Sequence, residues 1–229
     1  MTATGTDTFN PSLGGLGLYA LGKCGIRRAG VMPEHLVDVA MAANLILQDW
    51  GTEQPRLWNI ALNTVPLTTG QITVTCPSSV IIVTDAYLTI TTGGVSIDRI
   101  ISPVSRGEYA SYPVKTMKSP PTVYWFDRAI PPTLYLYPTP DANASYVLNY
   151  YSFNTTDDAA LGSAATLDIP TWTLRAFVDE LAAELAVSYA PQLAQGLAAR
   201  AAASKLRMDN QDRENVPLYL APNLGGYFR

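Results

Sequence analysis

The sequence is short of charged residues, since Asp, Glu, Lys and Arg make up 15% of its 229 residues, against about 25% in an average soluble domain. We interpret the deficit as surface that other subunits cover, because charge is depleted at the centre of protein interfaces. A plain low-charge domain is the alternative. The net charge of −4 argues against a protein whose main task is to grip nucleic-acid phosphates. It does not argue against a channel through which DNA passes.

Histidine and cysteine are also scarce, with one His and two Cys in the chain. His35 would have to serve any histidine base or histidine metal site, and no Ser or Cys nucleophile motif lies near it. We therefore expect a surface or interface histidine. Cys24 and Cys76 have no partners at metal-binding spacing, so we expect two reduced, buried thiols in a cytosolic protein. The sequence predicts no catalytic residue, no cofactor and no metal site.

Long apolar runs are missing as well. No stretch of about 18 apolar residues occurs, so the sequence predicts no transmembrane helix and no membrane partner. The first ten residues are polar and lack the basic start and apolar segment of a signal peptide.

Three patterns could carry chemistry, and we favour a structural interpretation of each. Residues 15–20 match a variant of the dinucleotide fingerprint, but no strand precedes them, so we expect a glycine-rich helix. Glu180 and Glu184 lie one helical turn apart and could form an acid/base pair, although a solvated or channel-facing helix side fits better. Aromatic residues 124–137 could stack on sugars or single-stranded nucleic acid. Alternating aromatics in strands more often pack within sheets and interfaces.

Helical periodicity appears at both ends of the sequence. Apolar residues between 13 and 26 suggest a short first helix, which several glycines weaken. A clearer helix begins at Pro33 and ends at Trp50, before Gly51. Near the other end, Asp168 or a neighbour is expected to cap a helix that starts around Pro170. Pro191 should break this helix, and an alanine-rich helix follows over residues 192–208.

The helix that begins at Pro33 carries two apolar stripes rather than one. The first contains Leu36, Leu47 and Trp50, and the second contains Val37, Met41 and Leu45. A helix with two apolar stripes is covered on two sides, by its own domain or by a neighbouring subunit. We expect the helices to carry subunit contacts. The residues predicted at subunit interfaces are Leu36, Leu47, Trp50, Leu181, Leu185, Asp127 and Arg128.

Between the helical regions the apolar period shifts to two, the period of half-buried strands. Thr-Gly, Gly-Gly and Pro clusters separate seven candidate strands. They span residues 57–65, 71–76, 81–90, 95–102, 123–126, 133–137 and 146–153. Short strands this close in sequence pair antiparallel, as a small sandwich or a curled sheet.

These patterns predict an α+β fold, in which helices from both ends form a helical core and an antiparallel β domain is inserted between them. The predicted parts are residues 1–55 and 157–208 for the helices, 56–156 for the β insertion, and 209–229 for an extended C-terminal arm. The arm has an acidic start and then too many large apolar residues for a solvated tail, so it should become ordered on a partner. The alternative is that it folds back on its own subunit.

The segment 102–151 carries the most specific pattern. Ser105 and Glu108 have capping-box spacing and predict a short helical turn. The order of residues around them resembles the head-to-tail adaptor family of tailed bacteriophages, also called tail accessory factors or packaged-DNA stabilisation proteins. The matching residues are Glu108, Tyr109, Lys115, Tyr124, Asp127, Arg128, Leu136, Tyr137, Pro138, Pro140 and Asp141. Ser119 departs from the family's usual Gly before the Pro-rich stretch.

The resemblance implies a structural virion protein of the neck or tail, assembled in the host cytoplasm. It implies a ring of identical subunits, dodecameric like the portal, that lies below the portal protein and extends the DNA channel. A downstream tail or nozzle protein would dock on the ring, and genomic DNA would pass through without specific binding. The arm would contact the portal. Its predicted portal-binding residues are Leu218, Tyr219, Leu220, Leu224, Tyr227 and Phe228. The alternatives are a phage-encoded hydrolase and a carbohydrate-binding β module.

Overall fold

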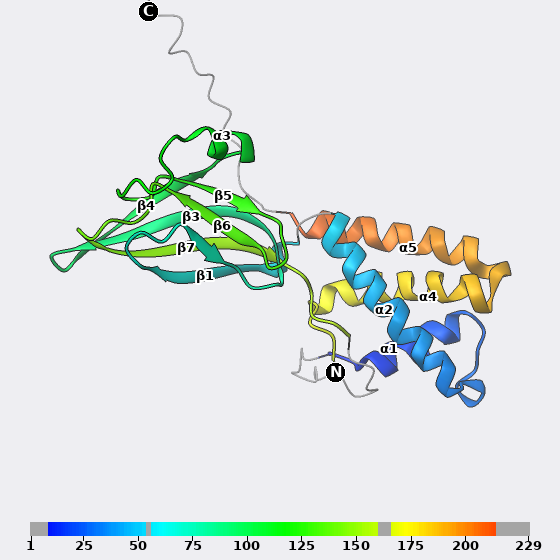
Figure 1. The fold of residues 1–229 in the computed structure, drawn as a ribbon. Helices are drawn as coiled ribbons and strands as arrows, with labels where there is room; N and C mark the ends of the chain where they lie inside the picture. Colours follow the sequence, from blue (N-terminus) through cyan, green and yellow to red (C-terminus); the bar gives the residue numbers. More distant parts are fainter. Residues whose placement is uncertain (1–8, 54–55, 160–165, 214–229) are drawn as a thin grey trace, which may run out of the picture.

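A computed structural model describes residues 9–53, 56–159 and 166–213. Helices from the two ends of the chain lie together, and a β part formed by the middle of the chain lies beside them (Figure 1). The predicted α+β arrangement, with a β insertion between N- and C-terminal helices, is confirmed.

The helical part consists of α1 (Leu13–Lys23), α2 (Pro33–Glu53), α4 (Leu174–Tyr189) and α5 (Pro191–Gln211). Helix α4 is the central helix, because α1, α2 and α5 all pack against it. It is accordingly the most buried helix, with nine of its side chains in the core. No helix of the described ranges is long and apolar enough to cross a membrane.

The core of the helical part is built from apolar faces of all four helices. Leu47, Phe177 and Leu181 are buried in a single cluster that joins α2 to α4. Full burial of a side chain of this size stabilises the fold by about 1.5–3 kcal/mol relative to exposure. Trp50 adds a hydrogen bond, since its indole Nε1 donates to Glu180 Oε2 at 2.6 Å. The two ends of the sequence therefore fold as one unit.

One glycine of α1 allows close helix packing. A Cβ atom at Gly17 would lie 2.5 Å from Cγ1 of Val39 on α2, closer than two carbon atoms can approach. Gly17 thus lets α1 lie directly against α2. The helical interpretation of the Gly-rich segment is confirmed, and the segment lies in a helix–helix contact.

All seven predicted strands are present in the β part. They are β1 (Ile60–Leu67), β2 (Thr73–Thr75), β3 (Val80–Thr92), β4 (Val95–Pro103), β5 (Val123–Asp127), β6 (Thr133–Tyr137) and β7 (Ser145–Asn154). Their order in the sheet is β1-β7-β3-β4-β5-β6-β2. Buried side chains from β3 and β7, among them Leu88 and Leu148, share one core with Leu134 and Leu136 of β6. The sheet therefore curls over its own core, as predicted.

One strand pair departs from the antiparallel prediction. Strands β4 and β5 pair in parallel over Ser102–Val123 and Pro103–Tyr124. Between them the chain forms α3 (Arg106–Ser111) and a loop, and this crossover turns the chain so that β5 runs in the same direction as β4. The hydroxyl of Ser105 accepts from the Glu108 amide at 3.1 Å, so the predicted helical start is confirmed.

Three helix boundaries differ from the sequence prediction. Helix α2 runs through Gly51 to Glu53, and α5 runs to Gln211 rather than ending near Met208. A 3-10 turn, Thr171–Thr173, precedes α4, so Thr173 and not Asp168 stands at its N-cap position. Tertiary contacts lie at both extended ends, since Asp209 of α5 pairs with Arg56 and Glu53 of α2 pairs with Lys205.

Candidate assembly surfaces

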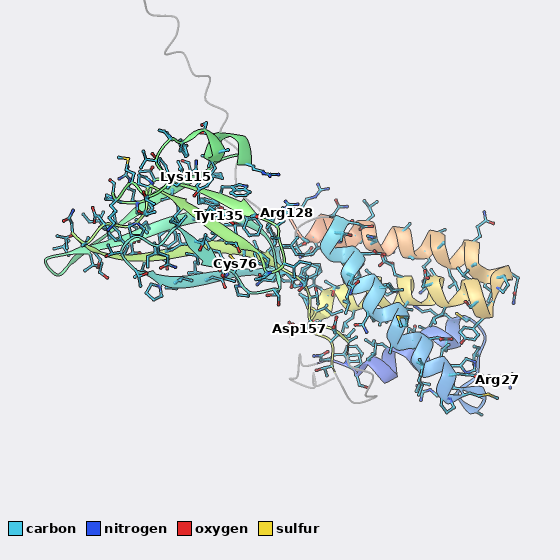
Figure 2. The ribbon with its side chains drawn as sticks, viewed as in Figure 1. Arg27, Cys76, Lys115, Arg128, Tyr135 and Asp157 are labelled. Carbon is cyan, nitrogen blue, oxygen red and sulfur yellow. The ribbon has the colours of Figure 1, made fainter. Side chains whose placement is uncertain are left out.

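Three residues of the family motif, Tyr109, Lys115 and Tyr137, pack with neighbouring aromatic residues of the segment 102–141. Tyr112 stacks on Tyr137 at 4.2 Å between ring centroids, and Trp125 stacks on Tyr135 at 4.7 Å. Lys115 lies over the rings of Tyr109 and Tyr112, and its Nζ donates to the backbone carbonyl oxygens of both residues. Figure 2 shows Lys115 and Tyr135 near each other at α3 and the sheet. The aromatic rings are occupied by internal packing, as we favoured.

Tyr124 points to the opposite face of the same strand. It is buried in the β core with Leu134 and Leu136, and burial raises the pKa of its phenol to about 12. The alternation of Tyr124 with Trp125 follows from the two-residue period of a strand. These aromatics hold α3 on one face of β5 and fill the core on the other.

Asp141, the last residue of the motif, anchors a turn. Its Oδ1 accepts from the Tyr146 hydroxyl at 2.7 Å and from the Asn143 amide at 3.0 Å. These hydrogen bonds to Tyr146 and Asn143 lower the pKa of its carboxyl group. The carboxylate therefore stabilises the β6–β7 connection.

His35 has a capping role at the start of α2. Its Nδ1 accepts a hydrogen bond from the Met32 amide at 2.8 Å, and its ring meets Tyr189 edge-on. In the ranges that the structure describes, no three His, Cys, Asp or Glu side chains gather as a metal site would require. Cys24 and Cys76 are free, buried thiols, as predicted.

A buried carboxylate holds three helices of the helical part together. Asp179 on α4 is ion-paired with Lys23 of α1 at 2.5 Å, Arg175 of α4 at 2.8 Å and Arg200 of α5 at 3.2 Å. Burial alone would raise the pKa of Asp179, but its hydrogen bonds and charge contacts with Lys23 and Arg175 outweigh burial and lower it. Three cations thus surround one anion on this side of the bundle.

A second charged cluster lies on the other side of α5. Lys205 forms ion pairs with Glu53 and, at 3.5 Å, with Glu180. Burial raises the pKa of Glu180, and the Trp50 and Lys205 contacts offset only part of this rise. Glu180 is therefore a structural carboxylate between α2, α4 and α5. Glu184 is exposed one turn further along α4.

Arg56 lies where the helical and β parts meet. Its buried guanidinium pairs with Asp209 at 2.5 Å, is 4.0 Å from Asp212, and lies between the rings of Trp50 and Trp58. The sequence predicts Asp209 as the first residue of the extended arm, but Asp209 belongs to α5 and pairs with Arg56. Sequence reasoning missed Arg56, because nothing near it in the sequence marks its partners.

The predicted interface residues fall into two groups. Leu47, Trp50, Leu181 and Leu185 are buried in the helical core of their own subunit, which leaves them little surface for a neighbour. Three others reach the surface. They are Leu36, which is 37% exposed, Asp127, which is half-buried, and Arg128, which is exposed where the sheet faces the helical part (Figure 2). The six predicted portal-binding residues lie outside the described residues.

The second apolar stripe of α2 is the exposed one. Val37, Met41 and Leu45 are 57%, 62% and 51% exposed and recur every four residues, so they form a continuous apolar row. Large apolar side chains in such a row are typical of interaction surfaces. Within the residues that the structure describes, the subunit does not cover this second stripe.

A comparison with known families identifies the family of the chain. The family model described as "SU10 adaptor protein" matches residues 27–222, which is most of the chain. The chain belongs to the SU10 adaptor family. Among curated proteins, none matches the sequence significantly.

Membership in the SU10 adaptor family makes the chain a bacteriophage adaptor, which is a structural protein of the virion neck. The resemblance inferred from residues 105–141 is thereby confirmed. The SU10 adaptor match extends over α2, the entire β part, α4 and α5. The match therefore covers both the helical and the β part of the subunit, and not the motif of residues 108–141 alone.

Proposed function

We propose that this adaptor forms a ring of identical subunits below the portal, dodecameric to match it, that extends the DNA channel and docks the next tail or nozzle protein. The family match over residues 27–222 carries the proposal. A connector of this kind acts mechanically. Many weak contacts, repeated around a ring, would hold the head and the tail together by avidity.

The surface composition of the helical part supports assembly with other copies. A chain with only 15% charged residues nevertheless leaves Val37, Met41 and Leu45 exposed on one helix. Covering such a row gains roughly 25 cal/mol for each Å² of apolar surface removed from water. A neighbouring subunit or the portal would provide that cover.

The C-terminal arm is the proposed portal contact. Helix α5 ends at Gln211 beside Arg56, and the apolar residues from Leu218 to Phe228 follow after it in the sequence. Their number exceeds what a solvated chain end carries. The arm would add binding energy without disturbing the folded subunit.

The mass of the protein in solution tests the proposal. We expect the portal ring of the same phage, mixed with this protein, to gain the mass of several adaptor copies in light scattering. A portal ring whose mass stays unchanged would contradict the proposal. The assembled ring is also expected not to bind duplex DNA tightly at moderate salt, because a conduit must release the polyanion.

A further inference from the structure

Two grooves of opposite charge flank α5. The first lies between α2 and α5 above α4, has a volume of about 340 Å³, and contains Asp49, Glu180, Glu184 and Lys205. We call it the acidic groove. The second, of about 290 Å³, lies between α4 and the last turns of α5 and contains Trp172, Arg175 and Arg207 with no carboxylate. We call it the basic groove.

The grooves face different sides of the bundle. Lys205 lines the acidic groove and Arg207 the basic groove. Two residues along an α-helix turn the side-chain direction by about 200°. Helix α5 therefore lies between the two grooves.

Each groove has charge that the fold itself does not neutralise. In the described part of the chain, Asp49, Glu184 and Arg207 make no ion pair. Arg175 pairs with Asp179, yet 59% of its side chain remains exposed. The acidic groove thus keeps an excess of negative charge, and the basic groove an excess of positive charge.

Each groove also has an exposed apolar side chain. Val187 lines the acidic groove and Trp172 the basic groove, and both are exposed. Exposed apolar groups with a charged rim are the usual composition of a protein interface. Free charge together with apolar surface favours a protein partner over a small ion.

We infer that the acidic groove of one copy docks on the basic groove of the next copy, in a head-to-tail contact of the helical parts. This inference rests on the proposed ring. A symmetric contact of either groove with itself would bring like charges together, which disfavours it. A head-to-tail contact uses two different surfaces of each subunit, so it repeats from copy to copy and generates a ring when the rotation closes.

Charge-swap variants test this contact. Asp49→Lys with Glu184→Lys reverses the acidic groove, and Arg207→Glu with Gln211→Glu reverses the basic groove while leaving the Arg175–Asp179 pair intact. Each double variant should raise the concentration for half-maximal assembly by about tenfold or more. The variant with all four changes should assemble nearly as well as the wild type. Sedimentation velocity with and without the portal ring measures assembly.

A matched control reverses charge elsewhere on the helices. Arg27 lies in the helical part at the end away from the β part (Figure 2), and both Arg27 and the adjacent Arg28 are exposed. The variant Arg27→Glu with Arg28→Glu should assemble normally. A second measurement needs no variant, because wild-type assembly should weaken as salt rises. Salt-independent assembly would overturn the inference, even if a reversed variant failed to fold.

The outcomes separate this inference from the proposed function. If the wild type assembles on the portal and both double variants do so equally well, the groove contact is wrong and the ring stands. The contact is also wrong if the fourfold variant assembles no better than the double variants, or if the Arg27/Arg28 control is equally impaired. A wild type that forms no assembly under any condition would overturn both.

Discussion

Arg56 and Asp209 form an ion pair of 2.5 Å across 153 residues of sequence, and this pair ties the first residues of the β part to the last turns of α5. The guanidinium is fully buried, and the rings of Trp50 and Trp58 enclose it. One buried cation and its carboxylate partners therefore help to join the two parts of the subunit.

Replacing Arg56 by alanine should destabilise the fold strongly. Removal of one partner from a buried ion pair leaves the other charge uncompensated and costs about 3–5 kcal/mol. Urea unfolding followed by circular dichroism measures the loss. Arg99→Ala, at an exposed position on β4, is the control and should change the unfolding free energy little. Equal losses for the two variants would show that the Arg56 pair contributes nothing specific.

Leu185 and Val187 lie two residues apart on α4 and have opposite environments, with 4% and 66% exposed. Leu185→Asp should unfold or severely destabilise the subunit, because it places an unpaired charge in the helical core. Val187→Asp should fold normally. Thermal melts of the two variants show whether Leu185→Asp is destabilised and Val187→Asp is not. A folded, cooperative Leu185→Asp variant would contradict the assignment of this residue to the core.

The buried Asp179 carboxylate should make stability depend on pH in the acid range. Its folded-state pKa is lowered, so its contribution is present above the unfolded pKa, about 3.9, and is lost as pH falls through the folded pKa. Asp179→Asn should therefore be less stable than the wild type at neutral pH. The difference in unfolding free energy between the two proteins should become smaller below about pH 4. Unfolding free energies measured from pH 3 to 7 provide the comparison. A difference that stays constant would contradict the ion-pair assignment.

Deleting residues 215–229 tests whether the C-terminal arm binds the portal. Because α5 and its contacts with Arg56 end before the deletion, the truncated subunit should fold and remain soluble. Its binding to the portal should be lost or greatly weakened, which co-sedimentation with portal rings detects. Full decoration of portals by the truncated protein would exclude the arm as the contact. A truncated protein that does not fold would favour an arm that packs on its own subunit.

Local patterns in the sequence determined the positions of the helices and strands. All seven strands and the helices on either side of Pro191 follow from apolar periodicity, Pro and Gly positions, because these constraints act within a few residues. The motif from Glu108 to Asp141 was specific enough to indicate the family, since its aromatic, Pro and Lys positions must fit one packed arrangement of α3, β5 and β6.

Only the tertiary structure decided which apolar residues are covered. The sequence of α2 does not distinguish its two apolar stripes, because both have apolar residues at helical spacing. One contains Leu47 and Trp50, and the other contains Met41 and Leu45. The packing of α4 buries the first and leaves the second exposed. The parallel β4–β5 pair, the Arg56–Asp209 contact and the separation of the grooves by α5 likewise join residues that are distant in the sequence. Their positions depend on how whole elements pack, and no local pattern records that.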